Sequence, residues 1–462
     1  MIALPQRGVL TVPLAVGAAA VAGALSAAQP MAAVALVGVT VLVVLTMLFP
    51  VAQLTVLLVV TTLVPFELQN AFSASPGLLV SDVLLILALA RAILLLLKRP
   101  LDRAWIGALA ATLLLLAVAV AQAAHGVAQG RDVSTTGAEL RALLGFGTVI
   151  VVLALVDDPF RRRTIFRALT LIGLLLGLLG IAQWFLQIPF SGAGDFGVRE
   201  GVALTSSGRG QIQGGLFAFP IAIILSVAAF AFGALRSSRA RAIVLCVLGL
   251  NVVSLLLTFE RTFWLATVIG CGYVAARAGW AQRVRTLIIA SITLFVLAVP
   301  LAVVAPETVT TARERLLSIG QYGNDNAVRY RLIEARHVID QIQERPWTGS
   351  GLGATIYWGR PYDGVAPRAY SFVHNGFLWL VWKLGIPGAA ILLSLITFGV
   401  LRRGRPRGDP MLAAVVAGSQ AGLLALTVAA VTFPSFTAAS ITPVLGVLLA
   451  FCFLPHQRSS KP

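Results

Sequence analysis

Apolar runs of about 20 residues recur along almost the whole chain, and they restrict its fold more than any other feature of the sequence. Hydrophobic residues make up 58% of the 462 residues and charged residues only 11%. A water-soluble domain cannot bury so much apolar surface. In lipid, a helix satisfies its own backbone hydrogen bonds, so each run predicts a spanning helix. We therefore expect an all-α polytopic membrane protein.

The apolar runs predict about 12–14 transmembrane helices. The count depends on the runs 31–49 and 51–65, which only Phe49-Pro50 separates, so they form either two helices or one kinked element. We place the helices near residues 8–28, 31–49, 51–65, 78–97, 104–124, 137–156, 168–188, 215–234, 242–258, 262–279, 286–305, 373–398, 411–431 and 438–455.

One long polar segment interrupts this pattern between the eleventh and twelfth expected helices. Residues 306–374 contain eight Arg and seven acidic residues. We expect three parts: helices 1–11 in residues 1–305, an extracytoplasmic and partly helical loop domain in 306–372, and helices 12–14 with a cytoplasmic tail in 373–462. Because a membrane protein tolerates charge mainly outside the hydrocarbon, we expect the chemistry in this insertion and at the helix ends beside it.

The formal net charge of +17 follows the membrane topology. Basic clusters such as 161–163, 236–241 and 402–407 occupy every second junction between the expected helices. Cytoplasmic loops carry such an excess of Arg and Lys, so these junctions face the cytoplasm and the insertion faces outward. A nucleic-acid partner would require the basic residues on one water-facing surface, and they are not gathered in that way. The expected surroundings are the lipid bilayer of the cytoplasmic membrane.

Within the insertion, residues 327–345 predict an amphipathic surface helix, in which Val338 and Ile342 are apolar and residues such as Glu334 are polar. Pro346-Trp347 ends this helix, and the glycines of 349–353 predict a turn or a strand with exposed backbone.

His374 is the strongest candidate for acid–base chemistry. It lies three residues after Ser371, which we take as the N-cap, so we expect it in the first turn of the next spanning helix. The positive end of the helix dipole disfavours the protonated ring, which keeps a neutral imidazole available to accept a proton. The alternative is a boundary histidine that only caps the helix. His337, by contrast, has the surroundings of an ordinary surface residue.

Arginines mark the outer ends of several expected helices. Arg261 follows Glu260 where two apolar helices are joined almost without a loop, so it is either an anion clamp or a side chain that reaches the headgroups. Arg199 and Arg209 lie in the glycine-rich loop 189–214, which is either a phosphate-binding loop or an ordinary flexible one. The guanidinium fork suits phosphate oxygens better than the ammonium of lysine does.

The motifs together resemble the O-antigen ligase and O-antigen polymerase superfamily. The resemblance is carried by Arg331-Leu-Ile-Glu-Ala, the run from Glu344 to Gly353, His374-Asn375-Gly-Phe-Leu378 and Gly385-Ile-Pro-Gly388. The segment 258–264 is also similar to the family's Ser-Arg helix start, with Glu260 where Ser is common. The motifs cover residues 190–390. Members of the family often carry Glu before the following Gly, where this chain has Lys383-Leu384-Gly385.

This resemblance implies a metal-independent, inverting glycosyltransferase that takes its glycan from a polyprenyl pyrophosphate carrier outside the cytoplasmic membrane and needs no cofactor. It implies catalytic roles for His374, Arg261 and Arg331. His374 would deprotonate the acceptor hydroxyl, and the arginines would neutralise the leaving pyrophosphate. The expected substrate-binding residues are Arg199, Arg209, Asn375 and Glu260, with Asn375 orienting the base.

Three other functions remain open, one of which is a non-catalytic assembly partner. A polymerase would use the same donor and would differ from a ligase only in its acceptor. The acceptor of this chain is a glycolipid, a glycan or a protein. We favour the ligase. A transporter would carry polar sites near mid-bilayer and repeated halves, whereas the charges here gather at the outer boundary.

Overall fold

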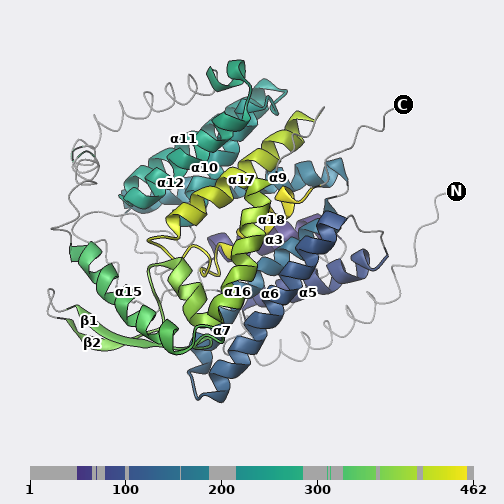
Figure 1. The fold of residues 1–462 in the computed structure, drawn as a ribbon. Helices are drawn as coiled ribbons and strands as arrows, with labels where there is room; N and C mark the ends of the chain where they lie inside the picture. The colour runs from purple at the N-terminus through teal and green to yellow at the C-terminus, as the bar shows by residue number, and fades with distance from the viewer. Residues whose placement is uncertain are drawn as a thin grey trace, which may run out of the picture.

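The computed structural model describes residues 49–64, 69, 79–98, 103–156, 158–186, 215–284, 310, 313, 326–360, 365–402 and 409–454. This part of the chain is almost entirely helical (Figure 1), which confirms the predicted fold class. Its elements are α3 (Pro50–Leu63), α5 (Val80–Leu96), α6 (Arg103–Ala128), α7 (Val133–Leu144), η1 (Gly145–Gly147), α8 (Thr148–Leu155), α9 (Pro159–Leu186), α10 (Gly215–Ala231), α11 (Ser238–Leu257), α12 (Arg261–Arg277), α15 (Asn326–Glu344), β1 (Ile356–Arg360), β2 (Val365–Tyr370), α16 (Gly376–Leu401), α17 (Pro410–Ala429) and α18 (Thr442–Cys452).

Six helical segments of the described chain are long and apolar enough to cross a membrane: Trp105–Ala128, Val133–Leu155, Pro159–Trp184, Ser238–Leu257, Gly376–Leu401 and Pro410–Ala429. The apolar helices Pro50–Leu63, Leu216–Ala231 and Thr442–Cys452 are shorter. The protein is therefore a multi-pass membrane protein. The expected helices 8–28 and 286–305, and nearly all of 31–49, lie outside the described residues. The total of 12–14 spans and the division into three parts stay predictions.

The helix expected at 137–156 is interrupted where it meets α18. A 3-10 turn at Gly145–Gly147 separates α7 from α8, and a Cβ on Gly145 would collide with Thr442. The Thr148 hydroxyl donates to the Pro443 carbonyl at 2.7 Å. Glycine has a low helix propensity, and without a Cβ it lets another helix approach closely. The start of α18 therefore packs directly against this break.

Small residues set the position of α11, the helix that ends just before Arg261. Gly173 and Gly177 lie one turn apart on α9, and their carbonyls accept hydrogen bonds from Asn251 (2.8 Å) and the Ser254 hydroxyl (3.0 Å) on α11. Small residues at this spacing let spanning helices approach closely, and the polar bonds fix their register. Helix α11 packs against α9 and α10, and α12 packs against α10 and α17 in the same part of the molecule (Figure 1).

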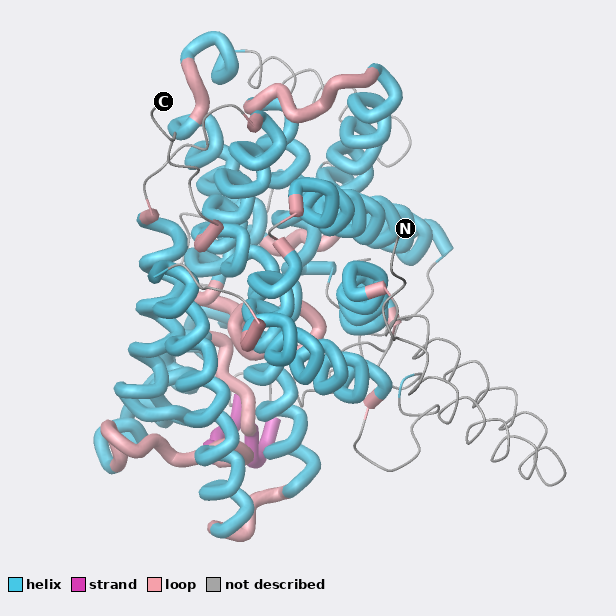
Figure 2. Tube along the Cα trace, turned by 90° about the vertical axis from the view of Figure 1, so that its right-hand side faces the viewer, coloured by secondary structure: helices cyan, strands magenta, loops and turns pink. Residues whose placement is uncertain are grey.

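The described part of the insertion, mainly residues 326–360 and 365–372, lies at one end of this helical body, where Figure 2 shows its two strands. The helix predicted for residues 327–345 is confirmed as α15, which packs against α16. Its position along the membrane surface stays a prediction. The antiparallel hairpin β1–β2, which pairs Ile356 with Tyr370, was not predicted. Its Tyr357 and Trp358 have high strand propensity, and Pro367 is tolerated because β2 is an edge strand.

Candidate active site

The start of α16 differs from the prediction in one respect. Asn375, and not Ser371, is the N-cap: its Oδ1 accepts the backbone N–H groups of Phe377 and Leu378, both at 3.0 Å. The predicted cap was wrong because an Asn directly before the helix satisfies its free N–H groups. His374 therefore lies just outside the helix, in extended chain held by its neighbours. A direct role of Asn375 toward substrate stays a prediction.

A buried carboxylate holds His374 at two points. Glu334 on α15 accepts the His374 backbone N–H at 2.9 Å, and its two oxygens lie 3.2 and 3.1 Å from the ring Nδ1. The Glu334 side chain is 2% exposed, whereas that of His374 is 36% exposed. A carboxylate at Nδ1 selects the tautomer that carries its proton there. This leaves Nε2 as the ring atom that can accept a proton.

Phe433, in the loop between α17 and α18, brings three elements of the site together. Its ring centroid lies 6.5 Å from that of His374 and 5.1 Å from that of Phe263 on α12. The guanidinium carbon of Arg331 lies 5.8 Å from the same centroid. The starts of α12 and α16 and the first half of α15 therefore meet around one aromatic ring.

A tight turn places Arg261 at this end of α12. Phe259 has a positive φ of 54°, which is strained for a residue with a side chain, and Glu260 follows in extended backbone as the residue before the helix. The next residue, Thr262, shares a hydrogen bond of 2.8 Å with the Thr432 hydroxyl, one residue before Phe433. Arg261 therefore belongs to the helix end that contacts the Phe433 loop.

The predicted residues are thus partly brought together. His374 and Arg331 flank Phe433, and Arg261 begins the helix that contacts it through Phe263. Arg199 and Arg209 lie outside the described residues. The binding roles predicted for these two, and for Glu260, stay predictions.

Sequence reasoning missed Glu334 as the partner of the histidine. A signal was present: Tyr330, Glu334 and Val338 recur at every fourth position and are all buried, so Glu334 lies in the apolar stripe of α15. A buried carboxylate needs a partner, and this position points to one. Phe433 carries no comparable signal, because only the folded chain brings its loop to the site.

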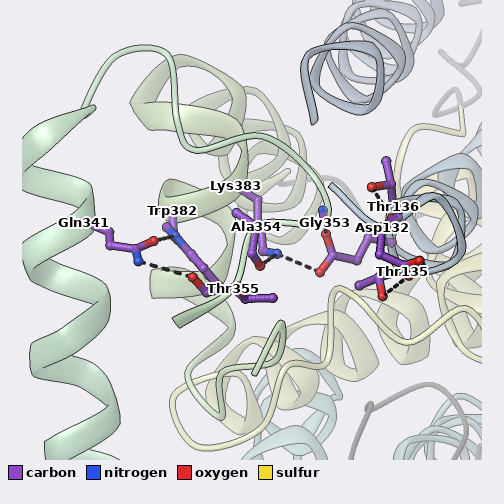
Figure 3. A network of polar contacts seen from close by, with 10 residues as sticks. Asp132, Thr135, Thr136, Gln341, Gly353, Ala354, Thr355, Trp382 and Lys383 are labelled. Carbon is purple, nitrogen blue, oxygen red and sulfur yellow. Dashed lines mark hydrogen bonds and ion pairs between the residues drawn. The ribbon is translucent and has the colours of Figure 1, made fainter. Parts of the chain in front are cut away.

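A second charge pair joins α16 to α7 (Figure 3). Lys383 on α16 is fully buried; its Nζ lies 2.7 Å from Glu139 Oε1 on α7 and donates to the Ala354 carbonyl at 2.6 Å. The other Glu139 oxygen accepts the Gly353 N–H at 2.7 Å. The lysine that departs from the family pattern is thus matched by a carboxylate from another helix.

Asp132 begins α7 in the same region. Its Oδ2 accepts the Thr135 hydroxyl and backbone N–H, both at 2.7 Å. These bonds lower the pKa of the Asp132 carboxyl.

The glycine motifs of the insertion and of α16 interlock. Gly349, Gly351 and Gly353 all have positive φ, at 70°, 81° and 76°, and Gly385 breaks α16 at φ 69°. The break frees the Trp382 carbonyl, which accepts the Ser350 N–H at 2.7 Å, and the Ile386 N–H donates to Pro346 at 2.8 Å. The glycines are needed because a Cβ on Gly349 or Gly385 would collide with the opposite backbone.

The fold and site define a multi-pass helical membrane protein in which a histidine–carboxylate pair, Arg331 and the start of the helix that carries Arg261 lie at one end of the helices. Residues 244–393 match the Wzy_C family, described as O-Antigen ligase. The matched region contains Arg261, Arg331, Glu334 and His374, whereas Phe433 lies beyond it. No curated protein matches the chain. The chain is therefore a membrane protein with an O-antigen ligase family domain, which confirms the resemblance found in the sequence.

Proposed function

We propose that the protein transfers a glycan from a polyprenyl pyrophosphate carrier to an acceptor hydroxyl at the outer face of the cytoplasmic membrane. The observation that carries this proposal is the pairing of His374 with buried Glu334, beside Arg331 and within the region that matches the family. A base oriented by a buried carboxylate is the arrangement that activates a hydroxyl nucleophile in other transferases and hydrolases.

The chemical step follows from this geometry. The acceptor hydroxyl gives its proton to Nε2 of His374 while its oxygen forms a bond to the anomeric carbon of the donor sugar. The bond between that carbon and the pyrophosphate oxygen breaks, and the leaving carrier keeps the electron pair. Attack opposite the leaving group inverts the configuration of the sugar. Glu334 stabilises the imidazolium that forms, and the ring then returns its proton to water.

Arg261 and Arg331 would supply the positive charge that the leaving pyrophosphate needs. Two guanidinium groups offer planar pairs of N–H donors, which match phosphate oxygens and carry charge independently of pH. Donors fixed before the reaction stabilise developing charge effectively in a site that excludes water. Independence of metal ions is part of this proposal.

The distribution of basic residues supports the proposed orientation. Arg161, Arg236 and Arg402 lie at helix ends opposite to the start of α16. An excess of arginine marks the cytoplasmic side, so His374 would face outward, where lipid-linked glycans are assembled onto acceptors.

A direct transfer assay tests the proposal. The full-length protein in proteoliposomes would receive a polyprenyl pyrophosphate-linked glycan and a glycolipid acceptor. We expect His374→Ala to abolish transfer and His337→Ala, an exposed histidine three residues after Glu334, to leave it unchanged. Transfer by His374→Ala at the wild-type rate would refute the proposed base.

The acceptor decides between ligase and polymerase, and we favour the ligase. Glycans of a deletion strain would separate the two: long lipid-linked polymers accumulate without a ligase, and single lipid-linked repeats accumulate without a polymerase.

A further inference from the structure

A basic cavity lies at the helix ends opposite the candidate active site. It has a volume of about 590 Å³ and is formed by the start of α9, the loop between α10 and α11, and the start of α17. Helix α11 runs from this cavity to the turn that precedes Arg261, and its 20 residues extend about 30 Å. The cavity is therefore separate from the site around His374, and its size is that of a small-molecule or lipid headgroup site.

Three arginines line the cavity. Arg163 and Arg167 lie one turn apart on the same face of α9, and Arg236 approaches from the loop before α11. All three are exposed, and within the part of the chain that the structure describes none of them forms an ion pair. Asp409 also lines the cavity, and its Oδ1 caps α17 by accepting the N–H groups of Met411 (3.0 Å) and Leu412 (3.3 Å). The cavity thus keeps a net positive charge.

An apolar wall continues from the arginines toward the centre of the helices. Leu171 and Leu174 follow on α9, and Ile243 faces them from α11. Leu171 is 48% exposed and Ile243 is 44% exposed, as expected for side chains that contact lipid. Cationic groups at a helix end above an exposed apolar wall complement a molecule with an anionic head and a hydrocarbon tail.

We propose that this cavity binds an anionic phospholipid of the cytoplasmic leaflet. The phosphate would lie among Arg163, Arg167 and Arg236, and an acyl chain would lie along Leu171, Leu174 and Ile243. Basic pockets between spanning helices on the cytoplasmic side bind anionic lipid headgroups in this manner. The proposal does not depend on the transferase activity, because binding is measured directly.

Native mass spectrometry of the purified full-length protein tests it, with phosphatidylglycerol and phosphatidylcholine as probes. We expect preferential binding of phosphatidylglycerol to the wild type. The variant Arg163→Gln/Arg167→Gln/Arg236→Gln should weaken that binding at least about tenfold. The single variant Arg236→Gln, in a loop where folding is little affected, should cause a partial loss.

The matched control is Arg161→Gln/Arg239→Gln/Arg241→Gln, which removes the same charge from the same side of the protein outside this cavity. It should weaken binding less than about threefold. Equal losses in both triple variants would mean general surface attraction and would overturn the proposal. So would an unchanged affinity in the cavity variants, no preference over phosphatidylcholine, or displacement of the lipid by inorganic phosphate.

Discussion

The Lys383 ammonium, which is fully buried on α16, lies 2.7 Å from the Glu139 carboxylate on α7. Each group also binds the backbone next to the glycines of 349–353. Lys383 donates to the carbonyl of Ala354, and Glu139 accepts the N–H of Gly353. Each buried charge thus has an opposite charge and a backbone partner, which is the condition for keeping charges in a membrane interior. The pair joins two spanning helices to the insertion that carries Glu334.

Breaking this pair should destabilise the protein strongly. In Lys383→Met the Glu139 carboxylate stays buried without its cation, so we expect the free energy of unfolding to fall by about 3–5 kcal/mol. The double variant Glu139→Gln/Lys383→Met should recover part of this loss, because no unpaired charge remains. Thermal unfolding in nanodiscs measures both, with Lys98→Met at an exposed helix end as the control. If the double variant lost as much stability as the sum of the losses in Lys383→Met and Glu139→Gln, the two side chains would not be coupled.

Glu334→Gln should slow transfer without weakening substrate binding. The amide cannot fix the Nδ1–H tautomer or stabilise the imidazolium, so we expect kcat to fall by about 10²–10⁴ with KM nearly unchanged. Glu334→Asp should restore part of the rate. Glu344→Gln, at an exposed position on the same helix, serves as the control. A normal kcat for Glu334→Gln would show that the carboxylate has only a structural role.

Local sequence predicts the helices, such as α15, but not the side-chain pairs that join residues distant in the chain. The length of the apolar runs and the periodic apolar stripe of α15 both predict helices, and the structure has helices at those runs that lie within its described residues. The pairing of Glu334 with His374 joins residues 40 positions apart. That of Glu139 with Lys383 spans 244 positions, so no local pattern contains it. The break at Gly145–Gly147 depends on contacts with α18, which lies about 300 residues later in the sequence.

Replacing the site arginines by lysine should impair transfer although the charge is kept. Arg261→Lys and Arg331→Lys each lose a planar pair of donors, and we expect kcat to fall about 10²-fold or more. Arg336→Lys, exposed on the outer face of α15, should behave as the wild type. Initial rates with saturating lipid-linked donor measure the effect. Near-normal turnover by Arg261→Lys would rule out its role as a clamp on pyrophosphate.

Alanine should have opposite effects on stability at the interlocked Gly385 and at Gly272, a glycine in open surroundings. Gly385→Ala places a methyl group on a residue with φ 69° and against the Trp347 carbonyl. We expect it to cost at least about 1–3 kcal/mol, because both the strained backbone and the collision oppose folding. Gly272→Ala lies within α12, where a new Cβ meets nothing within 4 Å, and should stabilise by up to about 1 kcal/mol. Thermal unfolding of both variants in the same nanodiscs compares them. If Gly385→Ala were as stable as the wild type, the junction between α16 and the insertion would not depend on the left-handed glycine.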